Sequence, residues 1–416
     1  MKKLFDIKND CRLCKSKNIL KVVSIGDSPI SEKYSSEKNS IPKDVLVPLD
    51  LYMCKDCGHV QIIHVVNPDF LWDNFTFKTS RNPKLINHYE NYVKNILNFT
   101  IKMPKNFVLD IGSNDGTLLK IFKKNNFNEI LGIDPAKEIA AEATSNGIKT
   151  IPDYMNKSNA DLIKNKYGKA NIITANNVYA HIDYMDELTD SIISLLDKEG
   201  IFVFEVSYLL DVIEKKLLGT VFHEHLSYHS LLPLIKFFEK KNMEIVEVIK
   251  NDLQGGSIVC YVQHKEGPYK ITDNVKDLIN IENEKKLDSP ESLFKFSKEL
   301  NFFKDEITNL INTISRDNEI IAGFGSARSA TTLIKFFDIA EKIQFIVDDN
   351  KDKHYKFTPG SRIQVFPSEY IYENEPKYLI IFAWEHADKI IKKHEEFLKK
   401  GGSFIKIFPK IEIIKN

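Results

Sequence analysis

The sequence predicts an α/β protein of three parts: a small metal-binding lobe, a doubly wound parallel sheet and a second Rossmann-like unit. Three observations support this prediction: two C-x-x-C pairs near the start, an apolar strand that runs into a Gly-containing turn at 107–117, and a restart of that pattern at 319. A chain of 416 residues is too long for one core. We place the three parts at 1–80, 81–268 and 269–416.

The N-terminal lobe contains two cysteine pairs that predict a structural zinc site. The four residues are Cys11, Cys14, Cys54 and Cys57. Thiolates bind zinc at about 2.3 Å, and four of them close a tetrahedral shell with no position for water. A redox dithiol is the alternative, but it would leave the second pair without a role. We expect His59 and His64 to be surface histidines and not ligands.

Strands alternate with helices in the middle part. A helix is expected over 85–98, followed by strands at 107–110, 130–134, 149–152, 172–175 and 200–206. This alternation is typical of a parallel sheet with helices on both faces, in which ligands bind at the carboxyl ends of the strands. The charged stretch 273–297 is expected to be a helical connector to the third part.

The turn at 110–117 favours S-adenosylmethionine over other nucleotide cofactors. Gly112 and Gly116 allow a sharp turn, while Asp110 and Asp115 would repel a phosphate and suit a cationic ligand. The next strand ends in Asp134, a position from which an acid accepts both ribose hydroxyls. The turn lacks the G-x-G-x-x-G and G-K-[ST] patterns of dinucleotide and P-loop sites.

Side chains at the other strand ends should reach the same crevice. The residues expected to bind the cofactor are Asp110, Gly112, Asn114, Asp115, Gly116, Asp134, Asn176 and Asn177. Glu205 lies near the end of the strand over 200–206 and, with Tyr208 and Tyr228, is expected to contact the substrate.

The segment 222–229, Phe-His-Glu-His-Leu-Ser-Tyr-His, is the densest cluster of proton-handling groups in the chain. A histidine with a pKa near neutral can act as a general base, and a carboxylate beside it can orient it or bind a sugar hydroxyl. The segment lacks H-E-x-x-H, which argues against a metalloprotease site. Metal ligation and structural histidines at a domain seam are the alternatives.

The strand, turn and helix pattern restarts at residue 319. Its first turn carries Gly325, Ser326 and Arg328 instead of acids, and segments 343–350 and 378–386 supply later strands. Open turn amides suit an anion, so these three residues are expected to bind the substrate. A purely structural glycine turn is an equally good interpretation.

Composition excludes some classes of partner. Lys plus Arg and Asp plus Glu each number 58, so no field of one sign favours a nucleic acid polymer or an anionic membrane. The N-terminus turns polar at once, and no apolar run of about 20 residues follows. Cysteine pairs that bind metal suit a reducing compartment. We therefore expect a cytoplasmic protein that is a monomer or a weak oligomer.

The ordered set of motifs resembles a bacterial family, the C-methyltransferases that act on nucleotide-linked keto-deoxysugars. The set comprises the four-cysteine lobe, V-L-D-I-G-S-N-D-G at 108–116, F-E-V-x-Y at 204–208, H-E-H-L-S-Y at 223–228, Q-G-G-S at 254–257, the Gly turn at 323–325, D-x-N at 348–350 and A-W at 383–384. The resemblance covers nearly the whole chain. It implies a class I S-adenosylmethionine methyltransferase core between the zinc-binding lobe and a C-terminal Rossmann-like domain.

The resemblance also implies residue roles. A histidine matching His225 would remove the proton beside a 4-keto group, the position matching Glu224 would bind the sugar, and His223 is grouped with them as catalytic. The terminal lobes would help to hold the nucleotide-linked sugar. Such chemistry would belong to surface-polysaccharide or deoxysugar biosynthesis.

Tyrosine hydroxyls typical of the family are missing from this chain. Phe222 replaces the tyrosine of Y-H-E-H, and Phe75 and Phe77 replace those of Y-x-Y-x-S-S. A phenol that stabilises an enolate can be worth roughly 10² in rate. Tyr208 or Tyr228 are candidates to replace it. Methylation on oxygen, and a silent relative that only binds the cofactor or the sugar nucleotide, therefore stay open as alternatives.

Overall fold

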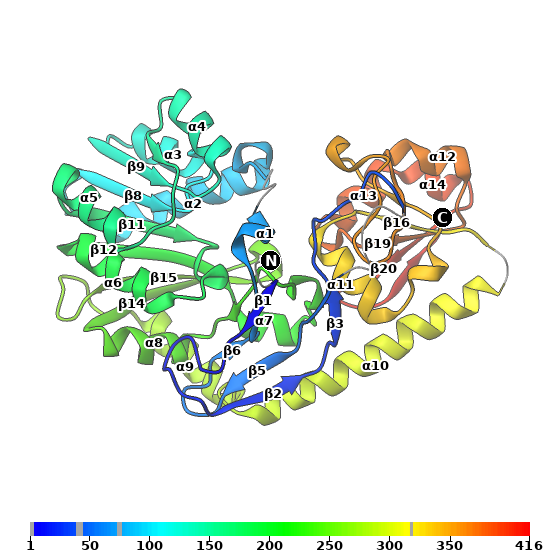
Figure 1. The fold of residues 1–416 in the computed structure, drawn as a ribbon, viewed down its shortest axis with the longest axis horizontal. Coiled ribbons are helices and arrows are strands. Elements are labelled where there is room, and N and C mark those ends of the chain that lie inside the picture. Colours follow the sequence, from blue (N-terminus) through cyan, green and yellow to red (C-terminus); the bar gives the residue numbers. More distant parts are fainter. Residues whose placement is uncertain (1–3, 39–44, 73–76, 317–318) are drawn as a thin grey trace.

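The computed structural model of the chain describes residues 4–38, 45–72, 77–316 and 319–416, and its main sheets have four, seven and six strands. In Figure 1 the seven-stranded unit lies on the left and the six-stranded unit on the right, with the blue N-terminal lobe between and below them. Helix α10 (Pro290–Ser315) runs below the lobe towards the right-hand unit. Within the described ranges, no helix combines the length and the apolar character needed to cross a bilayer.

The N-terminal lobe is built on an antiparallel sheet with the order β13-β6-β5-β2. Its strands are β2 (Ile19–Val23), β5 (Leu51–Cys54), β6 (Val60–Gln61) and β13 (Ser227–Tyr228). Around it lie β1 (Phe5–Ile7) paired with β7 (His64–Val66), β3 (Asp27–Pro29) paired with β4 (Leu46–Pro48), and α1 (Pro68–Trp72). Because β13 comes from the His-rich segment, the lobe is hydrogen-bonded directly to that segment.

The central sheet has the order β10-β9-β8-β11-β12-β15-β14. Its strands are β8 (Phe107–Ile111), β9 (Glu129–Ile133), β10 (Thr150–Ile151), β11 (Ala170–Asn176), β12 (Leu196–Ser207), β14 (Met243–Asn251) and β15 (Ser257–His264). The first five in this order are parallel, whereas β15 is antiparallel to both β12 and β14. The sheet thus differs from the 3-2-1-4-5-6 order of dinucleotide-binding folds.

Helices cover both faces of the central sheet. They are α2 (Pro83–Phe99), α3 (Thr117–Lys124), α4 (Lys137–Ser145), α5 (Lys157–Tyr167), α6 (Met185–Leu195), α7 (Leu209–Glu214) and α8 (Leu231–Lys240). Neighbouring residues of β8 point to opposite faces, so Val108 and Leu109 pack into two different apolar clusters. Both faces are therefore buried, as expected for a parallel sheet.

Local sequence explains where the helices beside the sheet begin. Helix α2 starts at Pro83 because Asn82 accepts hydrogen bonds from the backbone of the first turn. Helix α3 follows Gly116, whose φ of +74° is a left-handed conformation that glycine adopts without strain. The turn before α3 is thereby fixed next to the carboxyl end of β8.

The C-terminal unit repeats the parallel plan with the order β18-β17-β16-β19-β20-β21. Its strands are β16 (Ile321–Phe324), β17 (Ile346–Val347), β18 (Val365–Phe366), β19 (Tyr378–Ile381), β20 (Ser403–Lys406) and the antiparallel β21 (Glu412–Ile414). Its helices are α11 (Arg328–Phe337), α12 (Ile371–Asn374), α13 (Ala387–Lys393) and α14 (Glu395–Lys399). The connector expected over 273–297 is α9 (Asp273–Glu284) followed by the 26-residue α10.

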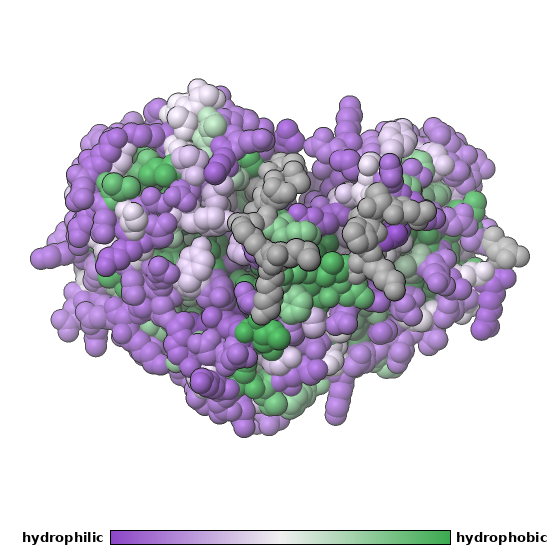
Figure 2. Space-filling view, viewed as in Figure 1, coloured by the Kyte–Doolittle hydropathy of each residue, from purple (hydrophilic) through white to green (hydrophobic). Residues whose placement is uncertain are grey.

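One continuous apolar core joins the three units, and Trp384 of the C-terminal unit packs against it. A Cβ added to Gly219 would lie 2.5 Å from the Trp384 Nε1, and one added to Gly255 would lie 2.7 Å from its Cη2. The two glycines therefore leave room for the indole of the C-terminal unit against the central unit. On the face shown in Figure 2, hydrophilic residues cover most of both large units, and hydrophobic residues gather near the centre, where the units meet.

Candidate active site

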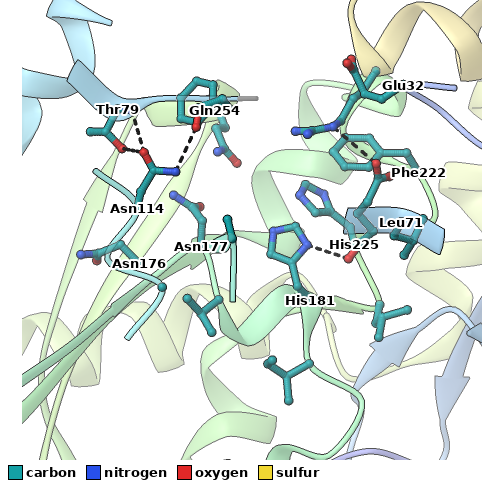
Figure 3. Close-up of a pocket in the computed structure, with 18 of the residues that line it drawn as sticks. Glu32, Leu71, Thr79, Asn114, Asn176, Asn177, His181, Phe222, His225 and Gln254 are labelled. Atoms are coloured by element: carbon teal, nitrogen blue, oxygen red, sulfur yellow. Dashed lines mark hydrogen bonds and ion pairs between the residues drawn. The ribbon is translucent and has the colours of Figure 1, made fainter. Parts of the chain in front are cut away.

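A cavity of about 600 Å³ lies where the three units meet. Its walls include the carboxyl ends of β8, β9 and β11, the His-rich segment, the N-terminal lobe and the first turn of α11. Figure 3 shows Asn114, Asn176 and Asn177 on one side of this cavity, Phe222, His225 and Glu32 on the other, and His181 between them. The two sides are called here the β8 side and the histidine side.

Asp134 organises the β8 side. Its Oδ2 accepts the backbone N–H of Asn114 at 2.8 Å, and its Oδ1 accepts the N–H of Ala136 at 2.8 Å. Burial raises the pKa of Asp134, and these two N–H groups oppose that effect. Each carboxylate oxygen has a second lone pair beyond its backbone contact, and Asp134 lines the cavity. The side chain is therefore suited to accept two neighbouring hydroxyls.

The turn after β8 is held open by left-handed residues and by the 77–80 segment. Gly112 and Asn114 have φ values of +72° and +51°, and both line the cavity. The Asn114 Oδ1 accepts the N–H of Thr79 at 3.0 Å, and its Nδ2 donates to the Phe77 carbonyl at 3.0 Å. Phe77 also lines the cavity, whereas Phe75 lies outside the described residues.

Three residues expected to bind the cofactor lie outside the cavity lining. Asp110 is buried and accepts a hydrogen bond from Thr174 at 2.6 Å, and burial raises its pKa to about 7. Asp115 accepts the N–H groups of Ser80 and Thr117. Gly116 packs against Ile148. The structure thus places these three beneath the turn, where they shape it without facing the cavity.

The remaining expected cofactor residues, Asn176 and Asn177, do line the cavity at the end of β11. Asn177 has a φ of +56°, and its N–H donates to the Glu205 carbonyl at 2.9 Å. Sequence reasoning missed the segment after β10, where Asp153, Tyr154 and Met155 line the same side. These residues could have been predicted from the sequence, because they follow the third parallel strand and ligands bind at the carboxyl ends of such strands.

His225 is fixed as one tautomer on the histidine side. Its Nδ1 lies 2.7 Å from the Thr220 carbonyl, and because a carbonyl only accepts, Nδ1 carries the proton and Nε2 keeps its lone pair. The ring stands 4.0 Å from the Phe222 ring and 5.0 Å from the His181 ring, centre to centre. Burial, with His181 and Arg328 nearby, lowers the pKa of His225 well below its usual value, so the imidazole is neutral.

His181 is also held as a single tautomer by a backbone carbonyl, and its place in the sequence was only weak evidence that it belongs to the site. Its Nδ1 donates to the Glu224 carbonyl at 2.7 Å, and burial lowers its pKa to about 4. It lines the cavity beside His225. Two neutral imidazoles therefore lie side by side, and the second belongs to His181 and not to His223 as expected.

Glu224 lies where all three units meet. The Ser31 hydroxyl of the N-terminal lobe lies 3.1 Å from each Glu224 carboxylate oxygen, and the Arg328 Nε of the C-terminal unit lies 3.4 Å from Oε1. Burial raises the pKa of Glu224, and Arg328 opposes that effect. Both Glu224 and Arg328 line the cavity.

A second ion pair, missed from the sequence, lines the same side. The Lys353 Nζ lies 3.2 Å from Glu32 Oε1, and both residues reach the cavity. Gln254 and Trp384 also line it. These residues come from three units far apart in sequence, and only the motifs at 254–257 and 383–384 had marked any of them.

Several expected site residues lie away from the cavity. His223 turns towards the N-terminal lobe, where its Nε2 donates to the Val47 carbonyl at 3.0 Å. Glu205 is buried between His88 and Asn251, at 2.7 Å from each. Tyr208 and Tyr228 are buried in the apolar core. All four side chains are buried in the protein interior and are absent from the cavity lining.

Of the three residues expected to bind the substrate in the C-terminal turn, Arg328 lines the cavity, together with its neighbours Ala327 and Ser329, whereas Gly325 and Ser326 are absent from the lining. The Ser326 N–H donates to Asp348 Oδ2 at 2.6 Å, and its carbonyl accepts from Tyr34 and, at 2.6 Å, from Lys353. Gly325 packs against Ala383. The amide of Ser326 expected to face an anion is thus satisfied inside the protein.

The four cysteines converge in the N-terminal lobe. Their Sγ atoms all lie within 4.8 Å of one another, with Cys11 and Cys57 at 3.6 Å and Cys14 and Cys54 at 3.4 Å. A tetrahedral zinc ion with bonds of about 2.3 Å needs sulfur atoms about 3.8 Å apart. The cluster therefore fits zinc. His59, expected at the surface, is fully buried, with its Nε2 3.1 Å from the Ser227 hydroxyl, because β13 covers it.

Three family models match successive parts of the chain. A zinc binding domain matches residues 11–72, a methyltransferase domain matches 86–248, and a C-methyltransferase C-terminal domain matches 252–409. The C-methyltransferase NovU of Streptomyces niveus is 28% identical over 407 residues, which covers 98% of this chain and 97% of that protein.

Solved methyltransferase structures align with less than half of the chain. An S-adenosylmethionine-dependent methyltransferase from Clostridium acetobutylicum ATCC 824 is 13% identical, covers 43% of this chain and 92% of its own, and gives a TM-score of 0.35. The magnesium protoporphyrin IX methyltransferase of Synechocystis PCC 6803 with bound S-adenosylhomocysteine is 16% identical, covers 46% and 90%, and also gives 0.35.

Proposed function

Because this chain is an S-adenosylmethionine-dependent C-methyltransferase with an N-terminal zinc-binding region, we propose that it methylates a carbon next to the keto group of a nucleotide-linked sugar. The expected fold class, the expected cofactor and the structural zinc are confirmed. The observation that carries the proposal is the fixed tautomer of His225 in the same cavity as Asp134.

The polar groups on the β8 side fit S-adenosylmethionine. Asp134 offers two acceptor positions to the ribose hydroxyls, and Gly112 leaves its backbone close to the cavity. The turn amide of Asn114 is occupied by Asp134, which leaves this N–H without capacity for a phosphate. When bound, the cofactor supplies a methyl group made electrophilic by a sulfonium.

His225 is suited to be the general base. Its proton sits on Nδ1 against the Thr220 carbonyl, so Nε2 is the nitrogen that can take a proton from carbon. In the proposed reaction that C–H bond breaks and its electron pair delocalises into the adjacent carbonyl as an enolate. This carbon would receive the methyl group from the bound cofactor, which leaves as S-adenosylhomocysteine, and His225 would hold the abstracted proton on Nε2 until it passes to solvent.

The histidine side suits an anionic sugar nucleotide. Arg328 and Lys353 place two cationic groups at the cavity, each paired at rest with a carboxylate, Glu224 or Glu32. A diphosphate can bind such cations, while the carboxylates can accept hydrogen bonds from sugar hydroxyls. The phenol that is typical of the family is absent beside this base, and the bare ring of Phe222 packs on His225 in its place.

One assay set tests this function. The zinc-loaded protein is incubated in deuterated water with methyl-labelled S-adenosylmethionine and a panel of nucleotide-linked 4-keto sugars. The proposal expects label on the carbon beside the ketone, and solvent deuterium exchange at that carbon when S-adenosylhomocysteine replaces the donor. Label on oxygen would contradict carbon as the acceptor, and transfer only to substrates without a sugar nucleotide would contradict the substrate class.

The role of His225 is tested with a matched histidine. His225→Gln should lower kcat by about 10²–10⁴-fold and abolish the deuterium exchange, because the base is lost. His223→Gln alters an equally buried histidine that also binds one carbonyl, but that lies outside the cavity lining. Its exchange rate should stay near that of the wild type. Unchanged exchange in His225→Gln would remove His225 from the role of base.

A further inference from the structure

Arg12 lies between two zinc-binding cysteines, yet its side chain leaves the metal site. It stands in the Cys11-Arg-Leu-Cys14 turn and is 0% exposed. Its backbone N–H donates to Gln61 Oε1 at 2.9 Å, which fixes the start of the side chain in the N-terminal lobe. A guanidinium is costly to bury unless its donors are satisfied, so its partners indicate what it is for.

The guanidinium reaches the central unit in two directions. Its Nη1 donates to the Leu226 carbonyl at 3.1 Å and to the Ile62 carbonyl at 2.6 Å, and its Nε donates to Asp183 Oδ1 at 3.0 Å. One fork-shaped group thus contacts the His-rich segment, the N-terminal lobe and the segment after η2 (Tyr179–His181). Arginine suits this position because its donors have a fixed planar geometry.

The two segments of the central unit that Arg12 contacts each carry a histidine that lines the cavity. Leu226 directly follows His225, and Asp183 is two residues beyond His181. The segments are also bonded to each other, since the Leu226 N–H donates to the Ala180 carbonyl at 2.7 Å and the His181 Nδ1 donates to the Glu224 carbonyl at 2.7 Å. Arg12 therefore closes a ring of hydrogen bonds that holds the two imidazole-bearing segments against one another.

We propose that Arg12 is a positioning residue, through which the zinc-binding turn fixes the tautomer and the placement of His225. This inference rests on the proposed function, in which His225 is the base. Arg12 belongs to the zinc-binding turn, its side chain donates to the Leu226 carbonyl, and the adjacent His225 keeps its Nδ1 on the Thr220 carbonyl. A small displacement of a catalytic base can lower the rate by about 10²-fold.

The test uses Arg12→Lys as the main variant and Asp183→Asn as a milder one. Lysine keeps the positive charge but its single nitrogen cannot reproduce the fork. Lys21→Met is the control, because Lys21 is a cation of the same lobe whose carboxylate partner is Asp50, at 3.1 Å. Zinc content, S-adenosylhomocysteine affinity, kcat, and the imidazole nitrogen signals of ¹⁵N-histidine-labelled protein are measured for each.

Arg12→Lys should retain one zinc and wild-type affinity for S-adenosylhomocysteine, while kcat falls by about 10–100-fold. The His225 signals, assigned by comparison with His225→Gln, should change from one Nδ1–H tautomer to a mixture. Asp183→Asn should show a smaller fall in kcat, and Lys21→Met should match the wild type.

Two results would overturn the inference. One is wild-type kcat and wild-type histidine signals in Arg12→Lys with zinc retained. The other is loss of zinc and of S-adenosylhomocysteine affinity in step with kcat, which would show a purely structural role. If the wild-type protein itself neither exchanges deuterium nor methylates carbon, the proposed function fails, and the histidine signals still decide whether Arg12 fixes the tautomer.

Discussion

Replacing Asp134 with asparagine should weaken the binding of S-adenosylmethionine without unfolding the protein. The carboxylate accepts the N–H of Asn114 and the N–H of Ala136, one on each oxygen. An asparagine has only one acceptor oxygen, so its NH₂ group must face one of these backbone donors. The variant also loses one of the two acceptors available to the ribose hydroxyls.

The expected magnitude follows from the lost contact. A hydrogen bond to a charged group contributes about 1.5–3 kcal/mol. Losing one such bond to the cofactor should therefore raise its Kd by about 10–150-fold, at 1.4 kcal/mol for each factor of ten. Isothermal titration calorimetry with S-adenosylmethionine and with S-adenosylhomocysteine measures this change directly.

Asp348 supplies a matched control within the same chain. Its Oδ2 accepts the Ser326 N–H at 2.6 Å and its Oδ1 accepts the Asn350 N–H at 2.8 Å, but it is absent from the cavity lining. Asp348→Asn should reproduce the strain on the backbone contacts and leave the Kd of the cofactor unchanged. An unchanged Kd in Asp134→Asn, or an equal loss in both variants, would refute the placement of the cofactor.

Three further predictions concern stability. Three buried histidines share a pKa that burial lowers to about 4: His181, His223 and His229. In the unfolded chain these histidines take up a proton below about pH 6.5, whereas in the folded protein they stay neutral until about pH 4. Each of the three should therefore lower the free energy of unfolding by about 1.5 kcal/mol as the pH falls from 6.5 to 5, which urea unfolding measures. Asp110, whose pKa in the folded protein is raised to about 7, stabilises the protein over the same pH range and offsets the effect of one histidine. A free energy of unfolding that does not change between pH 6.5 and 5 would contradict the buried neutral state of the histidines. Removal of zinc by a chelator should lower the melting temperature and abolish methyl transfer, both restored by zinc and not by magnesium; an unaffected melting temperature would contradict a structural metal. Gly219→Ala should cost about 1–3 kcal/mol because its Cβ would lie 2.5 Å from the Trp384 indole nitrogen, and an equal loss in a Trp384→Ala background would contradict that contact.

Local pattern was sufficient for most of the fold. Apolar runs predicted β8, β9, β11, β12 and β16 close to their observed positions, because such a run is made of side chains that are neighbours in sequence. The zinc cluster was predictable for the same reason, since each C-x-x-C turn is local. The pairing of β13 with β6 was not, because it joins residues 227–228 to an N-terminal lobe that is remote in sequence.

The site was only partly predictable, because a residue's position in a turn does not settle whether it faces a ligand. Asp134 and Asp348 follow equivalent strands and bind equivalent turn amides, yet only Asp134 lines the cavity. The difference comes from what covers each turn: Tyr34 and Lys353 contact Ser326 from outside the strand, whereas the turn at Asn114 stays open.

The sequence by itself determined the strands, the metal-binding cysteines and the presence of a histidine cluster, since each depends on contacts over a few residues. The tertiary structure decided that His225 and Glu224 face the cavity while His223 does not, that His181 joins them, and that Arg328 meets Glu224. These contacts join residues more than 40 positions apart in sequence, and they are fixed by which surfaces are buried when the chain packs.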